Sequence, residues 1–175
     1  MQSPSLNKNK EDSLAHFFST KWVDPSSLPS WAKKMKNQGK TIATLNGSFD
    51  LLHAGHLAIV YEASLQADIL IVALNTDDSI KKYKGPKRPL LTLEHRAYLI
   101  ASLEFVDYVT CFSEVDPREL LKKIVPDVHV NGAEYGENCI EAEVVKNLGA
   151  RLHLVKREPG LSTTEIVRKI QADIT

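Results

Sequence analysis

Residues 41–56 read TIATLNGSFDLLHAGH, and this stretch decides the fold. It opens with five apolar or β-branched residues, which is typical of a strand buried on both faces of a parallel sheet. Gly47 then lets the backbone turn sharply and come close to a ligand. His53 and His56 are three residues apart, so they share a face at the N-terminal end of the following helix if that helix has begun there, and Gly55 leaves room between them. The stretch therefore predicts an anion-binding turn at a helix N-terminus.

Strand and helix patterns alternate along the rest of the chain. Strands that are apolar throughout imply burial on both faces, and the helix-period segments between them supply right-handed crossovers. We therefore expect an α/β fold, a Rossmann-like, doubly wound parallel sheet of five strands in a single domain. The predicted strands are 41–45, 69–74, 106–110, 128–130 and 152–155, and the predicted helices are 57–66, 93–102, 117–125, 140–148 and 164–172.

The region before the sheet divides into two parts. Residues 1–13 are polar, and we expect a disordered tail there. Residues 14–38 form a predicted N-terminal helical extension of two short helices, with Pro29 in the first turn of the second helix and Gly39 as its C-cap. Residues 39–175 form the main predicted domain.

A long connection rich in Lys, Gly and Pro runs from Asn75 to Thr92. It exceeds an ordinary strand–helix loop, so it is a candidate substrate or lid segment. Its cations are most often just a solvated face. Because the connection follows the second predicted strand, it can also fold over the mouth of a site, and we predict phosphate contacts for Lys84 and Arg88.

Bulk composition excludes several classes of partner. Lys plus Arg total 22 and Asp plus Glu total 22, so the formal net charge is zero and gives no long-range attraction to nucleic acid or anionic membrane. Two cysteines without metal-ligand spacing favour a reducing compartment. No apolar run reaches transmembrane length. We expect a cytoplasmic protein whose partners are small molecules.

The histidine pair has other interpretations. A lone histidine in such a place is usually a capping or core residue, and a zinc site would need a third ligand that is not nearby. Two histidines around a glycine at the first strand–helix turn favour phosphate binding, so we predict no metal held by protein ligands. Asp50 and Asp77 lie near strand ends, where they either orient a histidine or a hydrated metal, or stabilise a turn.

A second block, REPGLSTT at residues 157–164, precedes the last predicted helix. Ser162, Thr163 and Thr164 are natural N-cap residues, and Arg157 adds a cationic clamp. Alone, the block indicates only a capped helix. Opposite the histidine turn, it is predicted to form the other wall of a triphosphate site.

Both blocks carry a family resemblance. Residues 46–56 resemble the GxFDxxHxGH signature of the cytidylyltransferase-like nucleotidylyltransferases, and residues 157–164 resemble the family's R-x-x-G-[IL]-S-T-T motif. The stretches KGPKRP, EHR and LEFVD at residues 84–107 are similar to the family's D-glycero-β-D-manno-heptose 1-phosphate adenylyltransferase branch. There are departures, because Ser48 stands where this branch commonly has Cys, and NGAEY at 131–135 replaces its usual K-G-G-D-Y.

The resemblance implies a nucleotidylyltransferase domain at 39–175 with the family's HxGH fold. The implied reaction transfers AMP from ATP to heptose 1-phosphate, with Mg²⁺ accompanying ATP, and the family tends to form homodimers. The implied catalytic residues are His53, His56, Lys84 and Arg157. The implied nucleotide-binding residues are Gly47, Ser48, Phe49, Asp50, Gly55, Asn131, Gly132, Ser162, Thr163 and Thr164. The implied acceptor-binding residues are Lys84, Arg88 and Arg96.

Two other functions stay open. The chain could be a cytidylyltransferase that uses CTP with glycerol 3-phosphate or an amino-alcohol phosphate. Glu104 stands where the glycerol-3-phosphate branch usually has Arg, which counts against that substrate. The chain could also be a nucleotide-sensing module with the same fold and no turnover. Release of pyrophosphate would separate the enzyme from the sensor.

Overall fold

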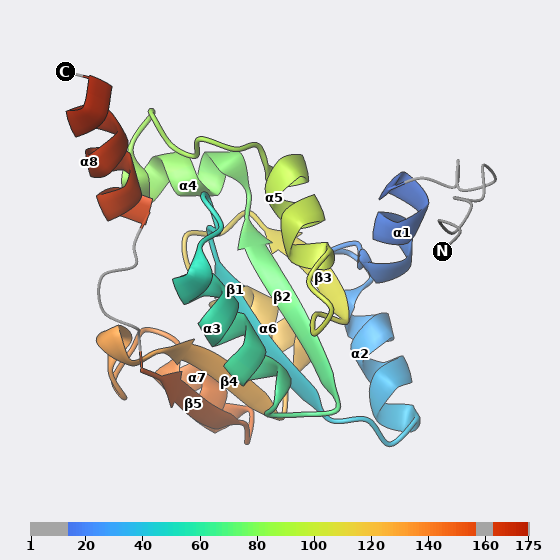
Figure 1. The fold of residues 1–175 in the computed structure, drawn as a ribbon. Coiled ribbons are helices and arrows are strands. Elements are labelled where there is room, and N and C mark those ends of the chain that lie inside the picture. The colour runs from blue at the N-terminus through green and yellow to red at the C-terminus, as the bar shows by residue number, and fades with distance from the viewer. Residues whose placement is uncertain (1–13, 157–162, 175) are drawn as a thin grey trace, which may run out of the picture.

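The computed structural model describes residues 14–156 and 163–174. It confirms the predicted sheet of five parallel strands (Figure 1). The strands are β1 (Ile42–Gly47), β2 (Ile69–Asn75), β3 (Tyr108–Phe112), β4 (Val128–Gly132) and β5 (Arg151–Val155). Their order is β3-β2-β1-β4-β5, so the chain winds outward from β1 first on one side and then on the other. The carboxyl ends of β1 and β4 therefore form the topological switch point, where ligands bind in such sheets.

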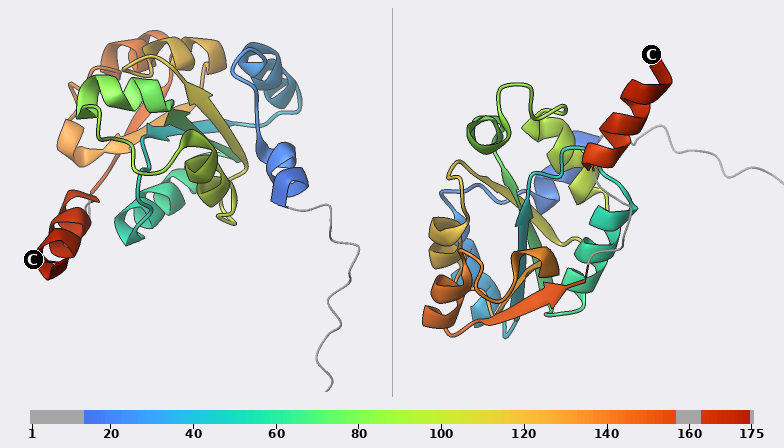
Figure 2. Two further views of the ribbon diagram at one scale, coloured as in Figure 1. Left: turned by 90° about the horizontal axis from the view of Figure 1, so that it is seen from above. Right: turned by 90° about the vertical axis from the view of Figure 1, so that its left-hand side faces the viewer.

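Helices cover both faces of this sheet (Figures 1 and 2). The helices of the described residues are α1 (Leu14–Lys21), α2 (Leu28–Asn37), α3 (Ala54–Ser64), α4 (Asp77–Lys84), α5 (Leu93–Ala101), α6 (Arg118–Ile124), α7 (Ala142–Asn147), α8 (Thr163–Ile174) and the 3₁₀ turn η1 (Ala133–Tyr135). Of these, α8 projects away from the sheet and does not cover it. Helices α3 and α5 pack on one face, and α2 and α6 pack on the other. Within the described residues, no helix is both long and apolar enough to cross a bilayer.

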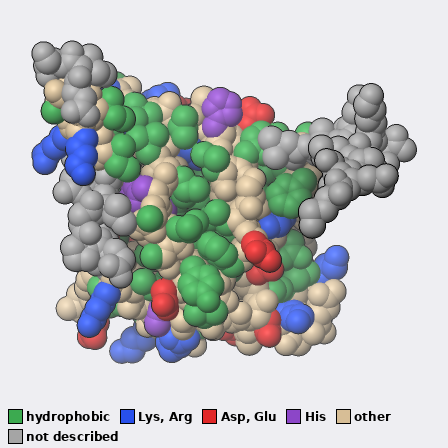
Figure 3. Space-filling view, in the orientation of Figure 1, with side chains coloured by type: hydrophobic (Ala, Val, Ile, Leu, Met, Phe, Trp, Pro, Cys, Tyr) green, Lys and Arg blue, Asp and Glu red, His purple; other side chains and the backbone are tan. Residues whose placement is uncertain are grey.

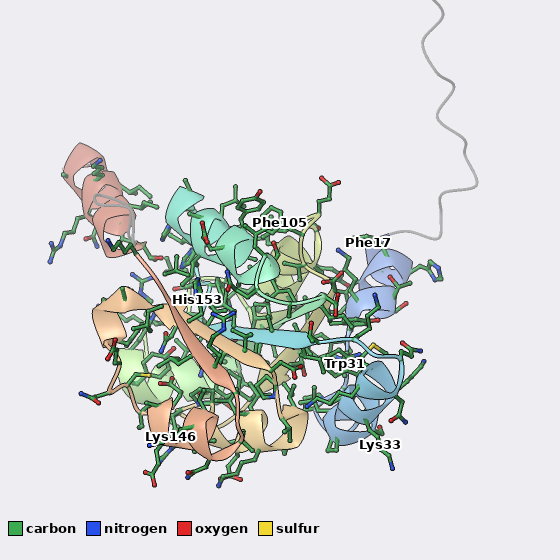
Figure 4. All side chains as sticks on the ribbon, turned by 90° about the horizontal axis from the view of Figure 1, so that it is seen from below. Phe17, Trp31, Lys33, Phe105, Lys146 and His153 are labelled. Carbon is green, nitrogen blue, oxygen red and sulfur yellow. The ribbon has the colours of Figure 1, made fainter. Side chains whose placement is uncertain are left out.

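The N-terminal extension packs into the core of the sheet domain. Leu28 of α2 is fully buried, and the ring of Trp31 lies 5.0 Å from that of Tyr108, between α2 and the sheet (Figure 4). Between α1 and α2, the backbone N–H of Val23 donates to the carbonyl of Val109 in β3 at 2.9 Å. The extension therefore covers the edge strand β3, which would otherwise expose unpaired backbone groups.

The long connection after β2 differs from the prediction, because its first half is the helix α4. Thr76 caps this helix by accepting a bond from the Ser79 N–H at 3.3 Å. Acidic residues occupy the first turn and lysines the last, which suits the helix dipole. Ile80 is the one apolar residue that α4 buries. A single inward apolar residue produces no helical periodicity, so the sequence pattern does not reveal this helix.

Candidate active site

A cavity of about 260 Å³ opens at the carboxyl ends of β1, β4 and β5. It lies at the switch point, where the fold places ligands. It brings together residues from the first strand–helix turn, the end of α4, the segment after β4 and the start of α8. The lining residues are Leu45, Asn46, Gly47, Ser48, Phe49, His53, Gly55, His56, Ala58, Ile59, Lys84, Asn131, Gly132, Glu134, Tyr135, Val155, Lys156 and Thr163.

The two histidines meet at the N-terminus of α3. His53 is the N-cap, and its Nδ1 accepts a bond from the backbone N–H of His56 at 3.3 Å. Their rings stack with centroids 3.8 Å apart and an angle of 22° between their planes. Both residues line the cavity, so the two imidazoles come together as predicted, although His53 caps the helix and is not part of its face. Imidazole donors at a helix N-terminus suit an anion.

Gly47 and Phe49 shape the turn that leads to these histidines. Phe49 has a φ of +46°, which is uncommon for a residue with a side chain. Its ring is buried and packs 5.2 Å from the ring of His56. A Cβ atom at Gly47 would lie 3.0 Å from that ring, so glycine is required here partly to accommodate Phe49. The sequence predicts that Gly47 lets the backbone approach a ligand, but it does not predict this packing against Phe49.

Lys84 reaches the cavity from the end of α4. Its Nζ donates a hydrogen bond to the Ser48 hydroxyl at 2.8 Å. Desolvation beside the cavity wall lowers the pKa of Lys84, and the neighbouring Asp50 carboxylate opposes that shift. The long connection from Asn75 to Thr92 therefore approaches the site through Lys84, as the sequence predicts.

Asp50 and Arg88 bind each other, and neither is among the residues that line the cavity, so their ligand contacts stay predictions. The Asp50 carboxylate accepts bonds from Arg88 Nη1 at 2.7 Å, from the Leu90 N–H at 2.6 Å and from the Leu91 N–H at 3.1 Å. Burial favours a higher pKa for Asp50, but these bonds outweigh it, and the pKa lies below its ordinary value. Asp50 therefore fastens the segment after α4 to the histidine turn.

Arg96 is also placed differently from the prediction of a substrate contact. Its side chain is fully buried, with 0% exposed. The guanidinium donates to the carbonyls of Ser48 at 2.6 Å and Asn75 at 2.9 Å, and to Asp77 Oδ1 at 2.7 Å. Nε donates to the Leu91 carbonyl at 3.1 Å. Arg96 thus joins the turn after β1, the end of β2 and the start of α4, and it positions the site's framework.

The segments after β4 and β5 contribute lining residues, three of which the sequence did not predict. Asn131 and Gly132 line the cavity as predicted, and the Asn131 side-chain oxygen accepts from the Gly132 N–H at 2.9 Å. The new residues are Glu134, Tyr135 and Lys156. The sequence could have identified these three residues, because each follows the carboxyl end of a predicted strand.

Residues 157–164, the predicted second wall of the triphosphate site, lie only partly within the described residues. Thr163, the first residue of α8, lines the same cavity as the histidines. The two helix N-termini therefore share one cleft, as the sequence predicts. Arg157 and Ser162 lie outside the described residues, as does the side chain of Thr164.

A parallel sheet with a histidine-lined turn at its switch point and a second helix start across the cavity defines a nucleotide-handling α/β protein. A family model described as cytidylyltransferase-like matches residues 44–169. The chain belongs to this cytidylyltransferase-like family of nucleotidyltransferases.

Named relatives narrow the position within the family. The chain is 45% identical over 167 residues to the bifunctional protein HldE of Aliarcobacter butzleri, which covers 95% of this chain and 33% of the relative. It is 43% identical over 171 residues to the bifunctional protein HldE of Sulfurimonas denitrificans, covering 97% of this chain and 34% of the relative. The chain thus spans about a third of the length of these relatives.

Solved structures share the fold. A lipopolysaccharide core biosynthesis protein from Thermoplasma volcanium matches with a TM-score of 0.55 and 28% identity, covering 69% of this chain and 98% of that chain. A pantoate-beta-alanine ligase from Francisella tularensis, in complex with a form of ATP and beta-alanine, matches with a TM-score of 0.59 and 16% identity. It covers 89% of this chain and 78% of that chain, and it supports the fold alone.

Proposed function

We propose that this chain transfers AMP from ATP to D-glycero-β-D-manno-heptose 1-phosphate, giving ADP-heptose and pyrophosphate. The observation that carries the proposal is the stacked His53–His56 pair in one cavity with Lys84 and Thr163. The acceptor is supported by the heptose-branch resemblance of residues 84–107 and by the HldE relatives. The lipopolysaccharide core biosynthesis protein among the solved structures is consistent with such a sugar.

The chemistry needs positioning and charge neutralisation. An oxygen of the sugar phosphate attacks the α-phosphorus of ATP, a new P–O bond forms, and the bond to the bridging oxygen breaks to release pyrophosphate. The attacking oxygen is already anionic at neutral pH, so no general base is needed. His53, His56 and Lys84 would neutralise the charge that develops on the phosphates. Gly47 and Ser48 would contact the nucleotide, and the segment after β4 would adjoin its base or ribose.

Mg²⁺ would enter this site with ATP. Among the described lining residues, Glu134 carries the one carboxylate, and the amides of Asn46 and Asn131 offer further oxygens. Mg²⁺ keeps most of its waters and needs few protein ligands when phosphates bind it, so this donor set fits a metal held chiefly by the substrate. When bound, the ion would offset phosphate charge.

A nucleotide and acceptor matrix tests the proposal. The protein is incubated with ATP or CTP, each with heptose 1-phosphate, glycerol 3-phosphate or no acceptor, and pyrophosphate release and ADP-heptose are measured. We expect turnover with ATP and heptose 1-phosphate, abolished when EDTA removes Mg²⁺. Turnover confined to CTP with glycerol 3-phosphate would replace this assignment with the cytidylyltransferase one. ATP binding without pyrophosphate release under any condition would indicate a sensor.

We also propose that the protein works as a cytoplasmic homodimer. Both cysteines, Cys111 and Cys139, are free thiols, which suits a reducing compartment. Exposed apolar side chains lie four residues apart at Leu57 and Tyr61 of α3 and at its C-cap Leu65. Figure 3 shows hydrophobic side chains gathered on the face of the molecule where α3 lies. Such patches are typical of protein interfaces. Light scattering should give twice the chain mass, and Tyr61→Glu should shift the protein towards monomer; a monomeric wild type would contradict the dimer.

A further inference from the structure

Ser48 is held from two sides by residues far away in the sequence. Its carbonyl oxygen accepts a bond from Arg96 Nη1 at 2.6 Å, and its hydroxyl accepts one from Lys84 Nζ at 2.8 Å. Arg96 also donates to Asp77 at the start of α4, and Lys84 is the last residue of that helix. Both ends of α4 are therefore tied to the residue that follows β1.

We infer that Ser48 is a positioning residue whose hydroxyl holds the Lys84 ammonium group at the cavity wall before the triphosphate binds. The inference rests on the proposed function, in which Lys84 meets the phosphates. A free lysine side chain samples many rotamers, and ordering it during the reaction costs conformational entropy. A lysine that is already ordered can stabilise the transition state without that cost.

A hydroxyl group suits this role because it accepts and donates at once. The Ser48 oxygen accepts a hydrogen bond from the ammonium group with a lone pair, and the same hydroxyl also hydrogen-bonds the Tyr83 side chain of α4. Both Ser48 and Lys84 line the cavity, so the serine holds the ammonium group where a phosphate oxygen can receive its hydrogen bond. Alanine at this position would remove the acceptor of the lysine, whereas threonine would keep it.

The charges around Lys84 explain why a neutral acceptor is needed. Arg88 from the segment after α4 and Arg96 from α5 repel the ammonium, while Asp50 attracts it. The Asp50 carboxylate already accepts three bonds from that segment, however. On α4 itself, the Tyr83 ring centroid lies 5.6 Å from the Lys84 Nζ. The Ser48 hydroxyl fixes the ammonium without cancelling the charge that the phosphates need.

Steady-state kinetics of five variants test the inference. Ser48→Ala should lower kcat by roughly tenfold, with less than about a twofold change in the KM for ATP, because the contact acts in the transition state. Ser48→Thr should restore most of the loss. In a Lys84→Ala background, Ser48→Ala should have no further effect, since its target is gone. Ser30→Ala, an exposed serine on α2, is the matched control. A full additional loss in the double variant would overturn the inference.

A second measurement needs no turnover, so it distinguishes this inference from failure of the proposed function. An amine-reactive reagent is applied to the substrate-free protein, and modification of Lys84 is followed by peptide mass spectrometry relative to the exposed Lys33. Loss of the hydroxyl acceptor destabilises the ammonium form, so Lys84 in Ser48→Ala should react about threefold faster or more at pH 8. Ser48→Thr should match the wild type. An unchanged rate of Lys84 modification in Ser48→Ala would refute the hydrogen bond between the two side chains, whatever the enzyme's substrate.

Discussion

The Asp50 carboxylate lies 2.7 Å from Arg88 Nη1, joining the turn before α3 to the segment after α4. The Asp50 side chain is 2% exposed and that of Arg88 is 21% exposed. Two backbone N–H groups, from Leu90 and Leu91, complete the bonding of the carboxylate. This buried ion pair therefore determines where the segment that precedes α5 crosses the site.

Replacing Asp50 should destabilise the fold more than replacing the carboxylate of an exposed ion pair. In Asp50→Asn, the Arg88 guanidinium loses its counter-charge, and because the pair is only partly buried, this loss should cost about 2 kcal/mol. Urea unfolding monitored by circular dichroism gives the free energy of unfolding. The matched control is Asp78→Asn, whose partner Lys81 forms an exposed pair within α4. The control should lose less than about 0.5 kcal/mol; equal losses in both variants would contradict the role given to Asp50.

The fold could be predicted from the sequence because its strongest signals are local. Five apolar strands separated by helix-period segments specify a parallel sheet, and the turn after β1 specifies the ligand end. The meeting of His53 and His56 follows from local spacing, because an N-cap and the third residue after it lie side by side at a helix N-terminus. These inferences need no knowledge of distant contacts, which is why the structure confirms them.

The partners of the charged residues could not be predicted in this way. Arg88 and Arg96 have a residue type that suits phosphate and Asp50 one that suits a nucleotide site with Mg²⁺, but their sequence neighbours do not show what else is within reach. Asp50 meets a residue 38 positions away, and Arg96 meets one 48 positions away. A buried charge takes whichever partner the fold brings close. The sequence therefore indicated which residues surround the site but not which of them face the ligand.

The histidine pair should contribute to turnover more than to binding. His53→Ala and His56→Ala should each lower kcat by about a hundredfold or more, because they remove donors to charge that develops in the transition state. The KM for ATP should change far less. The measurement is pyrophosphate release at saturating heptose 1-phosphate, with His95→Ala, an exposed histidine on α5, as the control. Near-normal kcat in both site variants would refute the assignment.

The buried His129 should make the protein sensitive to mild acid. Its side chain is 0% exposed, its Nδ1 lies 2.9 Å from the Thr44 hydroxyl, and burial lowers its pKa to about 4. Between pH 6.5 and 4 the unfolded chain binds a proton that the folded chain rejects, so stability falls as pH falls, by up to about 3 kcal/mol. Below pH 4 this contribution is constant. Urea unfolding across this pH range should show that the free energy of unfolding falls less steeply with falling pH in His129→Gln than in the wild type. Equal slopes in the two proteins would contradict the role of His129.

Arg96 should be the residue least tolerant of a conservative change. Its planar guanidinium donates to three backbone carbonyls and to Asp77, and a lysine ammonium cannot match that fork geometry. Arg96→Lys should therefore leave buried carbonyls unpaired and destabilise the protein by about 3 kcal/mol. It should also lower kcat/KM, because the Ser48 carbonyl and the start of α4 lose their common anchor. The control is Arg118→Lys, an exposed arginine at the start of α6 whose partner Asp116 lies two residues before it. Thermal unfolding and pyrophosphate release measure both effects, and wild-type values for Arg96→Lys would show that the framework does not depend on this side chain.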